Sequence, residues 1–131
     1  MQPVVFISGA SSGIGMETAR LLAQNGYTVY GAARRVDRMD SLKSYGVKTI
    51  GMDVVDDRSM TGAIKEILAN EGRIDILINN AGFGFYGAIE NVSMTDARYQ
   101  MEVNVFGATR LAQLLLPGMR ERCFGKIVNI S

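Results

Sequence analysis

SGASSGIG at residues 8–15 is the stretch that decides the predicted fold of this chain. The apolar run VVFI at residues 4–7 precedes it and is rich in β-branched and aromatic residues, as is typical of a parallel strand buried on both faces. An amphipathic run follows and ends at Asn25-Gly26, a common helix stop. The sequence therefore predicts a strand, a tight turn and a helix that begins at Gly13 or Ile14.

The glycines of this turn predict a phosphate-binding site. Gly9 permits the positive φ that a sharp exit from a strand requires, and the later glycines carry no Cβ to block a pyrophosphate. The helix that follows points free backbone N–H groups and the positive end of its dipole at an approaching anion. A nucleoside-triphosphate loop needs Lys and then Ser or Thr after its last glycine, and the Met16-Glu17 found there excludes that type. The candidate phosphate-binding residues are Gly9, Ser11, Ser12, Gly13, Ile14 and Gly15.

The glycine spacing and a second motif indicate a family. The turn reads Gly-x-x-x-Gly-x-Gly rather than the Gly-x-Gly-x-x-Gly of the common Rossmann turn, and the run at 76–78 leads into Asn79-Asn80-Ala81-Gly82. With these motifs the whole chain resembles the short-chain dehydrogenase/reductase family. The resemblance implies one α/β domain at 1–131, a Rossmann-like doubly wound parallel sheet with strand order 3-2-1-4-5, truncated after the fifth strand. It also implies hydride transfer between a nicotinamide and a carbonyl or alcohol substrate.

Composition agrees with one ordinary globular domain. Of the 131 residues 47% are hydrophobic and 21% charged, and the net charge of +1 argues against a nucleic-acid surface. Histidine is absent and Cys123 is the only cysteine, which argues against a metal site and favours a reducing compartment. No apolar run is long enough to span a bilayer, and no leader-like segment precedes the first strand. We therefore expect a cytoplasmic protein without a metal, nucleic-acid or membrane partner.

The rest of the chain predicts alternating strands and helices. Further strands are expected at 27–33, 47–52, 76–78 and 125–131, with a short helix at 37–45 and an amphipathic helix at 57–71 capped by Asp56. Ser93 opens a longer helical run with capping-box-like spacing to Asp96. Pro117-Gly118 is expected to disturb this helix. Its inward-facing residues are expected to be Met101, Val105, Leu111, Ala112 and Leu115.

Two arginines follow the second predicted strand and bear on the choice of cofactor. A NAD site has an Asp or Glu about twenty residues past the glycines to bind the ribose 2′-OH, but here Ala33 is followed by Arg34-Arg35. A guanidinium can donate two charge-assisted bonds to the 2′-phosphate of NADP. We therefore expect NADP(H) as the preferred cofactor and NAD(H) as the alternative. Arginines that are solvated, or that pair with Asp37 and Asp40, are the other interpretation.

The resemblance also implies residues for the rest of the cofactor. An Asp-Val pair after the third strand, here Asp53-Val54, lies beside the adenine in this family, whereas helix capping is the structural alternative for Asp53. In the second motif, asparagine side chains tie neighbouring strands together and Ala81-Gly82 leaves room for a ribose. Asn80, Ala81 and Gly82 are therefore expected to bind the cofactor.

A mid-helix asparagine is the candidate catalytic residue. In the family, the Val-Asn-x-x-Gly pattern, here at 103–107, carries a catalytic asparagine whose local helix distortion positions a water in a proton relay. That residue is Asn104 in this chain. An asparagine that only satisfies a kinked backbone is the structural alternative. The aromatic segment at 82–87 either walls a substrate entrance or packs on the domain's own surface.

The other catalytic residues of the family are expected after Ser131. In the family a strand ending in Asn-x-Ser-Ser supplies a serine, and a Tyr-x-x-x-Lys helix follows. Residues 129–131 match the start of the first motif, and no tyrosine of this chain has lysine four residues later. The resemblance therefore implies an oxidoreductase whose catalytic Ser, Tyr and Lys lie outside this chain, which is expected to be inactive alone. The alternative is a non-catalytic nucleotide-binding or interaction module. An apolar fifth strand at the sheet edge also predicts a homo-oligomer.

Overall fold

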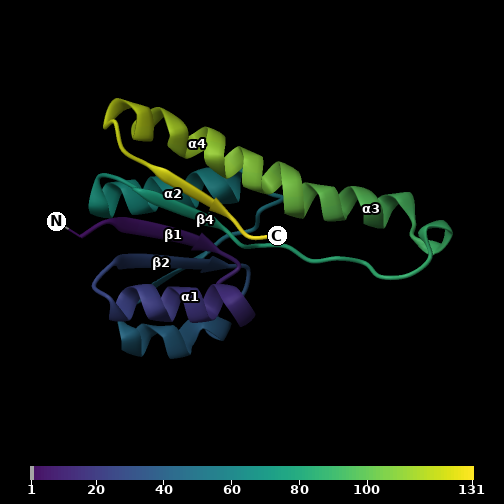
Figure 1. Cartoon of the computed structure of the whole chain (residues 1–131), viewed down its shortest axis with the longest axis horizontal. Helices are drawn as coiled ribbons and strands as arrows, with labels where there is room; N and C mark the ends of the chain where they lie inside the picture. The colour runs from purple at the N-terminus through teal and green to yellow at the C-terminus, as the bar shows by residue number, and fades with distance from the viewer. Residues whose placement is uncertain (1) are drawn as a thin grey trace.

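The computed structural model describes residues 2–131 as a five-stranded parallel sheet with helices on both faces (Figure 1). The order β3-β2-β1-β4-β5 confirms the predicted topology. The strands are β1 (Val4–Ser8), β2 (Thr28–Ala33), β3 (Lys48–Gly51), β4 (Ile76–Asn79) and β5 (Lys126–Asn129). The helical elements are α1 (Gly13–Gln24), the 3₁₀ segments η1 (Val36–Tyr45) and η2 (Ile89–Asn91), α2 (Asp57–Glu71), α3 (Met94–Met101), the π-helical η3 (Glu102–Gly107) and α4 (Ala108–Glu121).

The central strand β1 is buried throughout and feeds two cores. Successive side chains of a strand point to opposite faces, so Phe6 packs in the core beneath α2 and α4, while Val5 and Ile7 pack in the core beneath α1 and η1. Figure 1 shows α1 on one side of the sheet and α2 with α4 on the other. This burial explains why the first strand is apolar at every position.

The helix α2 begins and ends where its sequence signals predict. The carboxylate of Asp56 accepts hydrogen bonds from the backbone N–H groups of Arg58 and Ser59, and Gly72 ends the helix with φ of +78°. Ser93 likewise caps α3 by accepting from the N–H of Asp96 at 3.0 Å.

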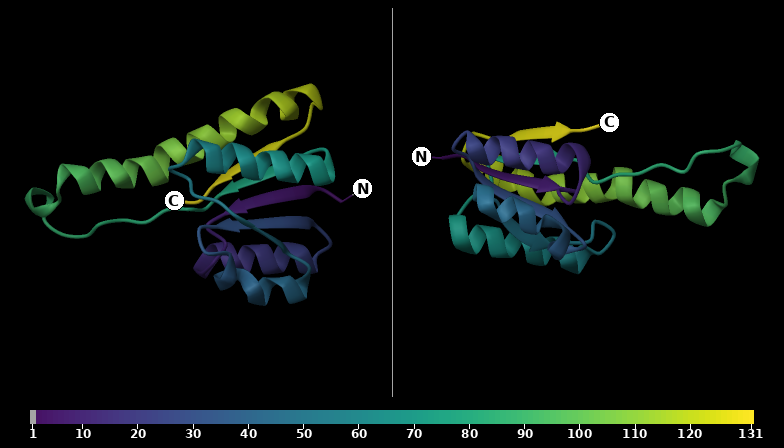
Figure 2. Two further views of the ribbon diagram at one scale, coloured as in Figure 1. Left: turned by 180° about the vertical axis from the view of Figure 1, so that it is seen from behind. Right: turned by 90° about the horizontal axis from the view of Figure 1, so that it is seen from below.

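The long helical run departs from the prediction in two ways. The predicted disturbance at Pro117-Gly118 is wrong, because α4 continues through Pro117 to Glu121 and buries Leu115 and Met119 against the sheet. The inward orientation predicted for Met101 and Val105 is also wrong, since they are 47% and 42% exposed. In all views of Figures 1 and 2, α3 and the loop before it extend beyond the sheet, so no core covers these side chains.

A buried carboxylate joins the starts of three strands. Asp75, 3% exposed, accepts a hydrogen bond from the N–H of Val4 at 2.8 Å and pairs with Arg73 at 2.9 Å. Its backbone carbonyl accepts from Lys126 at the start of β5. Nothing in the local sequence around Asp75 distinguishes a buried aspartate from a surface one.

Replacing Asp75 by alanine is expected to lower the free energy of unfolding by roughly 2 kcal/mol, because the buried N–H of Val4 loses its acceptor. Urea unfolding measures this effect. The matched control is Asp40→Ala, which removes an exposed ion pair to Lys43 and is expected to cost about 0.5 kcal/mol or less. Equal losses in both variants would show that Asp75 contributes no more than a surface charge.

Candidate functional site

A cleft of about 580 Å³ lies at the carboxyl ends of β1, β2, β3 and β4. Ten of the predicted site residues line it, which the parallel arrangement of the strands explains. They are Gly9, Ser11, Ser12, Ile14, Arg34, Asp53, Val54, Asn80, Ala81 and Gly82. Gly13 and Gly15 lie in the first turn of α1, Arg35 lines an adjoining pocket, and Asn104 lines a second cavity.

The glycine turn brings the backbones of three segments into contact. Gly9 has φ of +68°, and a Cβ there would lie 2.9 Å from the Cα of Ala81. A Cβ on Gly15 would meet both the carbonyl oxygen of Gly9 and the side-chain amide of Asn80. Gly13 also has a positive φ, of +56°, but a Cβ there would meet nothing within 4 Å, so this side of the turn is open. The turn therefore packs tightly against the sheet and presents an open backbone to the cleft.

The N-terminus of α1 is not capped by a side chain. Ser12 stands at the N-cap but its side chain makes no capping hydrogen bond, and the first turn contains no acidic residue. The α2 and α3 helices, in contrast, are capped by Asp56 and Ser93. Because the first N–H groups of a helix have no partner within the helix, the open end of α1 suits a phosphate group.

The two asparagines of the second motif tie neighbouring segments together as predicted. Asn80 donates from its side chain to the carbonyl of Gly9 at 3.0 Å, and Asn79 donates to the Oδ1 of Asn129 on β5 at 3.0 Å. The Oγ of Ser8 accepts from the N–H groups of Asn80 and Ala81 at 3.1 and 3.0 Å. The importance of Ser8 was missed, although a hydroxyl directly before Gly9 was a visible signal. These bonds connect the ends of β1, β4 and β5 beside the cleft.

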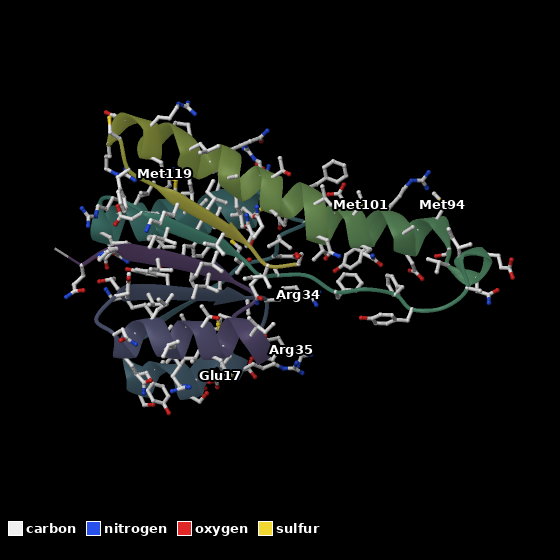
Figure 3. All side chains as sticks on the ribbon, in the orientation of Figure 1. Glu17, Arg34, Arg35, Met94, Met101 and Met119 are labelled. Atoms are coloured by element: carbon white, nitrogen blue, oxygen red, sulfur yellow. The ribbon has the colours of Figure 1, made fainter. Side chains whose placement is uncertain are left out.

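Three arginines line a pocket of about 300 Å³ next to the cleft. Arg34, Arg35 and Arg38 share it with Ser11, and Figure 3 shows Arg34 and Arg35 at the end of the sheet toward which the strand arrows point. Asp40 pairs with Lys43 instead, and within residues 2–131 no carboxylate lies within 4.0 Å of these three guanidinium groups. The alternative of arginines paired with Asp37 and Asp40 is therefore not what the structure shows. Arg38 was missed because it lies in the following 3₁₀ segment rather than at the strand end.

The Asp53-Val54 pair lines the cleft beyond the arginines. The Oδ1 of Asp53 accepts from the N–H of Val55 at 3.1 Å, and its own N–H donates to Ser59 at 2.9 Å. The cap of α2 is Asp56, so the capping alternative for Asp53 does not apply. Val54 packs under the helical run, where a Cβ on Gly107 would lie 2.6 Å from the carbonyl oxygen of Val54.

Asn104 lies in a distorted helix turn, as the pattern at 103–107 predicts. Residues Glu102–Gly107 form a π-helical segment between α3 and α4, a type of insertion that often marks functional sites. The Asn104 side chain accepts from the N–H of Phe83 at 3.0 Å and donates to the carbonyl of Phe83 at 2.7 Å. It also lines a second cavity of about 1110 Å³ beside the cleft.

Aromatic rings of the segment after Gly82 pack on the domain and line the cleft, and a role at a substrate entrance stays a prediction. The rings of Phe83 and Phe85 pack edge to face with centroids 5.1 Å apart, and Tyr99 lies 5.5 Å from Phe83. These three rings also line the cleft. Tyr86 is 97% exposed and lines the second cavity. The segment therefore forms a wall between the two spaces.

The donor set suits a ligand that carries phosphate groups at two places. One place is the open end of α1 and the other is the arginine pocket, and Ser11 and Arg34 belong to both the cleft and that pocket. From residue 2 onward, no three His, Cys, Asp or Glu side chains lie together in a group that could hold a metal ion. Over the same residues no helix combines the length and the apolar character that crossing a membrane would require.

Comparison with protein families gives a match over nearly the whole chain. The model of a family described as short chain dehydrogenase matches residues 3–131. A 3-ketodihydrosphingosine reductase of Bacteroides thetaiotaomicron is 40% identical over 132 residues, which cover 100% of this chain and 48% of that protein. The chain spans about half the length of the curated relatives it matches.

Solved structures agree with this match. A short-chain dehydrogenase from Streptomyces avermitilis superposes with a TM-score of 0.96 at 40% identity, covering 100% of this chain and 49% of that one. A metagenomic short-chain oxidoreductase in complex with NADP superposes with a TM-score of 0.93 at 28% identity, covering 98% of this chain and 62% of that one. The similarity therefore includes both the sequence motifs and the arrangement of the strands.

Proposed function

This chain belongs to the short-chain dehydrogenase family, and on that premise we propose that it is the dinucleotide-binding part of an NADP(H)-dependent oxidoreductase. The observation that carries the proposal is the pocket of three arginines, which no carboxylate of residues 2–131 approaches within 4.0 Å, beside the uncapped end of α1. The NADP complex of one relative supports the same cofactor. NAD(H) remains the alternative cofactor.

The residues of the cleft divide among the parts of the cofactor. We propose that the N–H groups at the start of α1 bind the pyrophosphate, with Gly9, Ser11, Ser12, Gly13, Ile14 and Gly15 forming the turn around it. Arg34 and Arg35 bind the 2′-phosphate, because a guanidinium donates charge-assisted bonds in a planar fork. Asp53 and Val54 lie beside the adenine, and Asn80, Ala81 and Gly82 beside a ribose. The bound nicotinamide would supply or accept the hydride.

The substrate in this proposal is a small molecule with a carbonyl or alcohol group. The relative named a 3-ketodihydrosphingosine reductase supports the carbonyl class. Asn104 is the candidate catalytic residue of this chain, and the π-helical turn that carries it supports the role. The complete reaction also requires the Ser, Tyr and Lys that the family resemblance implies outside residues 1–131. We therefore propose activity for the whole protein rather than for these residues alone.

Titration of the protein with NADPH and NADH, followed by nicotinamide fluorescence, tests the cofactor. We expect NADPH to bind at least about tenfold tighter, since one charge-assisted hydrogen bond contributes roughly 1.5–3 kcal/mol. As a control, 2′,5′-ADP should displace NADPH at lower concentration than 5′-AMP. Equal affinities for the two dinucleotides would contradict the preference for NADP(H).

A nucleotide-binding or interaction module without turnover is the second candidate function. Its discriminating observation is binding without reaction, so NADPH oxidation is measured with a panel of aldehydes and ketones, and NADP⁺ reduction with a panel of alcohols. Turnover with any member supports the oxidoreductase. Tight NADPH binding by the full-length protein without turnover on any carbonyl or alcohol would favour the module.

The remaining proposals concern the surroundings of the protein. We propose a cytoplasmic location, on the composition and the single cysteine. We also propose a homo-oligomer as the assembly state of the protein. Neither a nucleic acid nor a membrane is part of the proposal.

A further inference from the structure

Two amide side chains hold the loop that follows Gly82. This loop runs alongside α3 in every view of Figures 1 and 2. The Oε1 of Gln100 accepts a hydrogen bond from the N–H of Phe85 at 3.0 Å. Asn104 accepts from the N–H of Phe83 at 3.0 Å and donates to the carbonyl of Phe83 at 2.7 Å. The loop is therefore fixed to the helix through its backbone at two points.

The spacing of these two points matches the spacing of the groups they bind. Gln100 and Asn104 are four residues apart, about one turn of the helical run, so their side chains project from the same side of it. Phe83 and Phe85 are two residues apart, about 6.5 Å in an extended chain. Both amides thus reach backbone N–H groups that point the same way. A shift of the loop by one residue would present the wrong groups to both amides.

The register of the loop decides which side chains face which space. Phe85 lines only the cleft and Gly84 and Tyr86 line only the second cavity, whereas Gly82, like Phe83, lines both. This alternation follows the period of two that an extended chain imposes. Phe83 lies at the boundary and lines both spaces. A slip by one residue would exchange the two sets.

Packing alone holds the aromatic rings only loosely. Phe83, Phe85 and Tyr99 are 37%, 43% and 37% exposed as whole residues, so the core does not enclose their side chains. Gly82 allows Asn104 to approach the loop closely, since a Cβ on Gly82 would lie 3.0 Å from the Oδ1 of Asn104. The hydrogen bonds to Gln100 and Asn104 are therefore the specific contacts that place the rings.

We propose that Gln100 is a positioning residue which, together with Asn104, sets the register of residues 82–86 and thereby the aromatic wall of the dinucleotide cleft. The inference rests on the proposed function for the ligand of that cleft. Gln100 acts through the N–H of Phe85 and lines neither of the two spaces itself. Its role is distinct from that proposed for Asn104.

The test compares Gln100→Met, which keeps the length of the side chain but removes the acceptor, with Gln100→Glu, which keeps an acceptor oxygen. In the protein containing Gln100→Met, the amide of Phe85 should exchange with solvent about five- to tenfold faster. The amide of Phe83, still bound to Asn104, should change less. The NADPH dissociation constant should rise severalfold, and Gln100→Glu should restore both quantities. Gln113→Met on α4, an exposed glutamine, is the control and should change neither.

The outcomes separate this inference from the proposed function. Unchanged exchange at Phe85 in Gln100→Met would overturn the register role, whatever the cofactor. Faster exchange with an unchanged NADPH dissociation constant would show that the wall does not belong to the dinucleotide site, which also overturns the inference. If the unmodified protein binds neither dinucleotide, the proposed function fails while the exchange measurement still tests the contact. A general loss of protection across the sheet in Gln100→Met would mark a folding defect, and Gln100→Glu then decides alone: wild-type exchange supports the inference and fast exchange at Phe85 overturns it.

Discussion

Gly15→Ala is expected to lower the free energy of unfolding by about 3 kcal/mol and to weaken NADPH binding at least about tenfold. The new Cβ would meet the carbonyl oxygen of Gly9 and the side-chain amide of Asn80, which are hydrogen-bonded to each other at 3.0 Å. Relief of the clash requires α1 to move away from β1, and this movement displaces the N–H groups at the open end of the helix. Urea unfolding and NADPH titration measure the two effects.

Gly62→Ala is the matched control for this substitution. Gly62 lies inside α2, and a Cβ there meets nothing within 4 Å. Alanine has a higher helix propensity than glycine, so this variant is expected to be stabilised by about 0.5–1 kcal/mol. The free energy of unfolding is expected to fall in Gly15→Ala and to rise in Gly62→Ala. This difference separates the steric requirement of the turn from helix propensity. If the Gly15→Ala protein were as stable as the Gly62→Ala protein, the clash expected between a Cβ at residue 15 and Gly9 and Asn80 would be contradicted.

Features of the fold that depend on local chemistry could be predicted from the sequence. The bounds of α2 follow from Asp56 and Gly72, because capping and a left-handed C-cap are decided by the residues at the ends. The cleft residues also follow, since the carboxyl ends of parallel strands meet at one edge of the sheet. The strand ends were predicted to within two residues, because each strand is a short apolar run.

Features that depend on tertiary neighbours could not be predicted. Met101 and Val105 have the spacing of a buried stripe but extend past the sheet, and a sequence does not show where a sheet stops covering a helix. Asp75 is buried because Val4 and Arg73 satisfy it, and the contact with Val4 depends on the pairing of β1 with β4. The partners of Ser8 also arise only when distant segments meet.

Arg34→Asp is expected to weaken NADPH binding by about 100-fold while changing NADH binding by threefold or less, because loss of two charge-assisted bonds removes roughly 3 kcal/mol. Arg34 lines both the cleft and the arginine pocket, so it is the arginine best placed to bind a phosphate on a ribose held in the cleft. The new carboxylate would repel the 2′-phosphate of NADPH but can accept from the 2′-OH of NADH. Titration of each dinucleotide measures the two constants.

The control and the neighbouring arginine complete this test. Arg58→Asp on α2 makes the same charge change at an exposed arginine outside the pocket and should leave the ratio of the two constants unchanged. Arg38→Ala should weaken NADPH binding by about tenfold, as expected for a single charge-assisted bond. Raising the salt concentration should reduce the effect of Arg38→Ala on NADPH binding, because salt screens exposed charges. If Arg34→Asp instead weakened NADPH and NADH equally, its effect would be on the whole cleft, and the arginine pocket could no longer account for a preference for NADP(H).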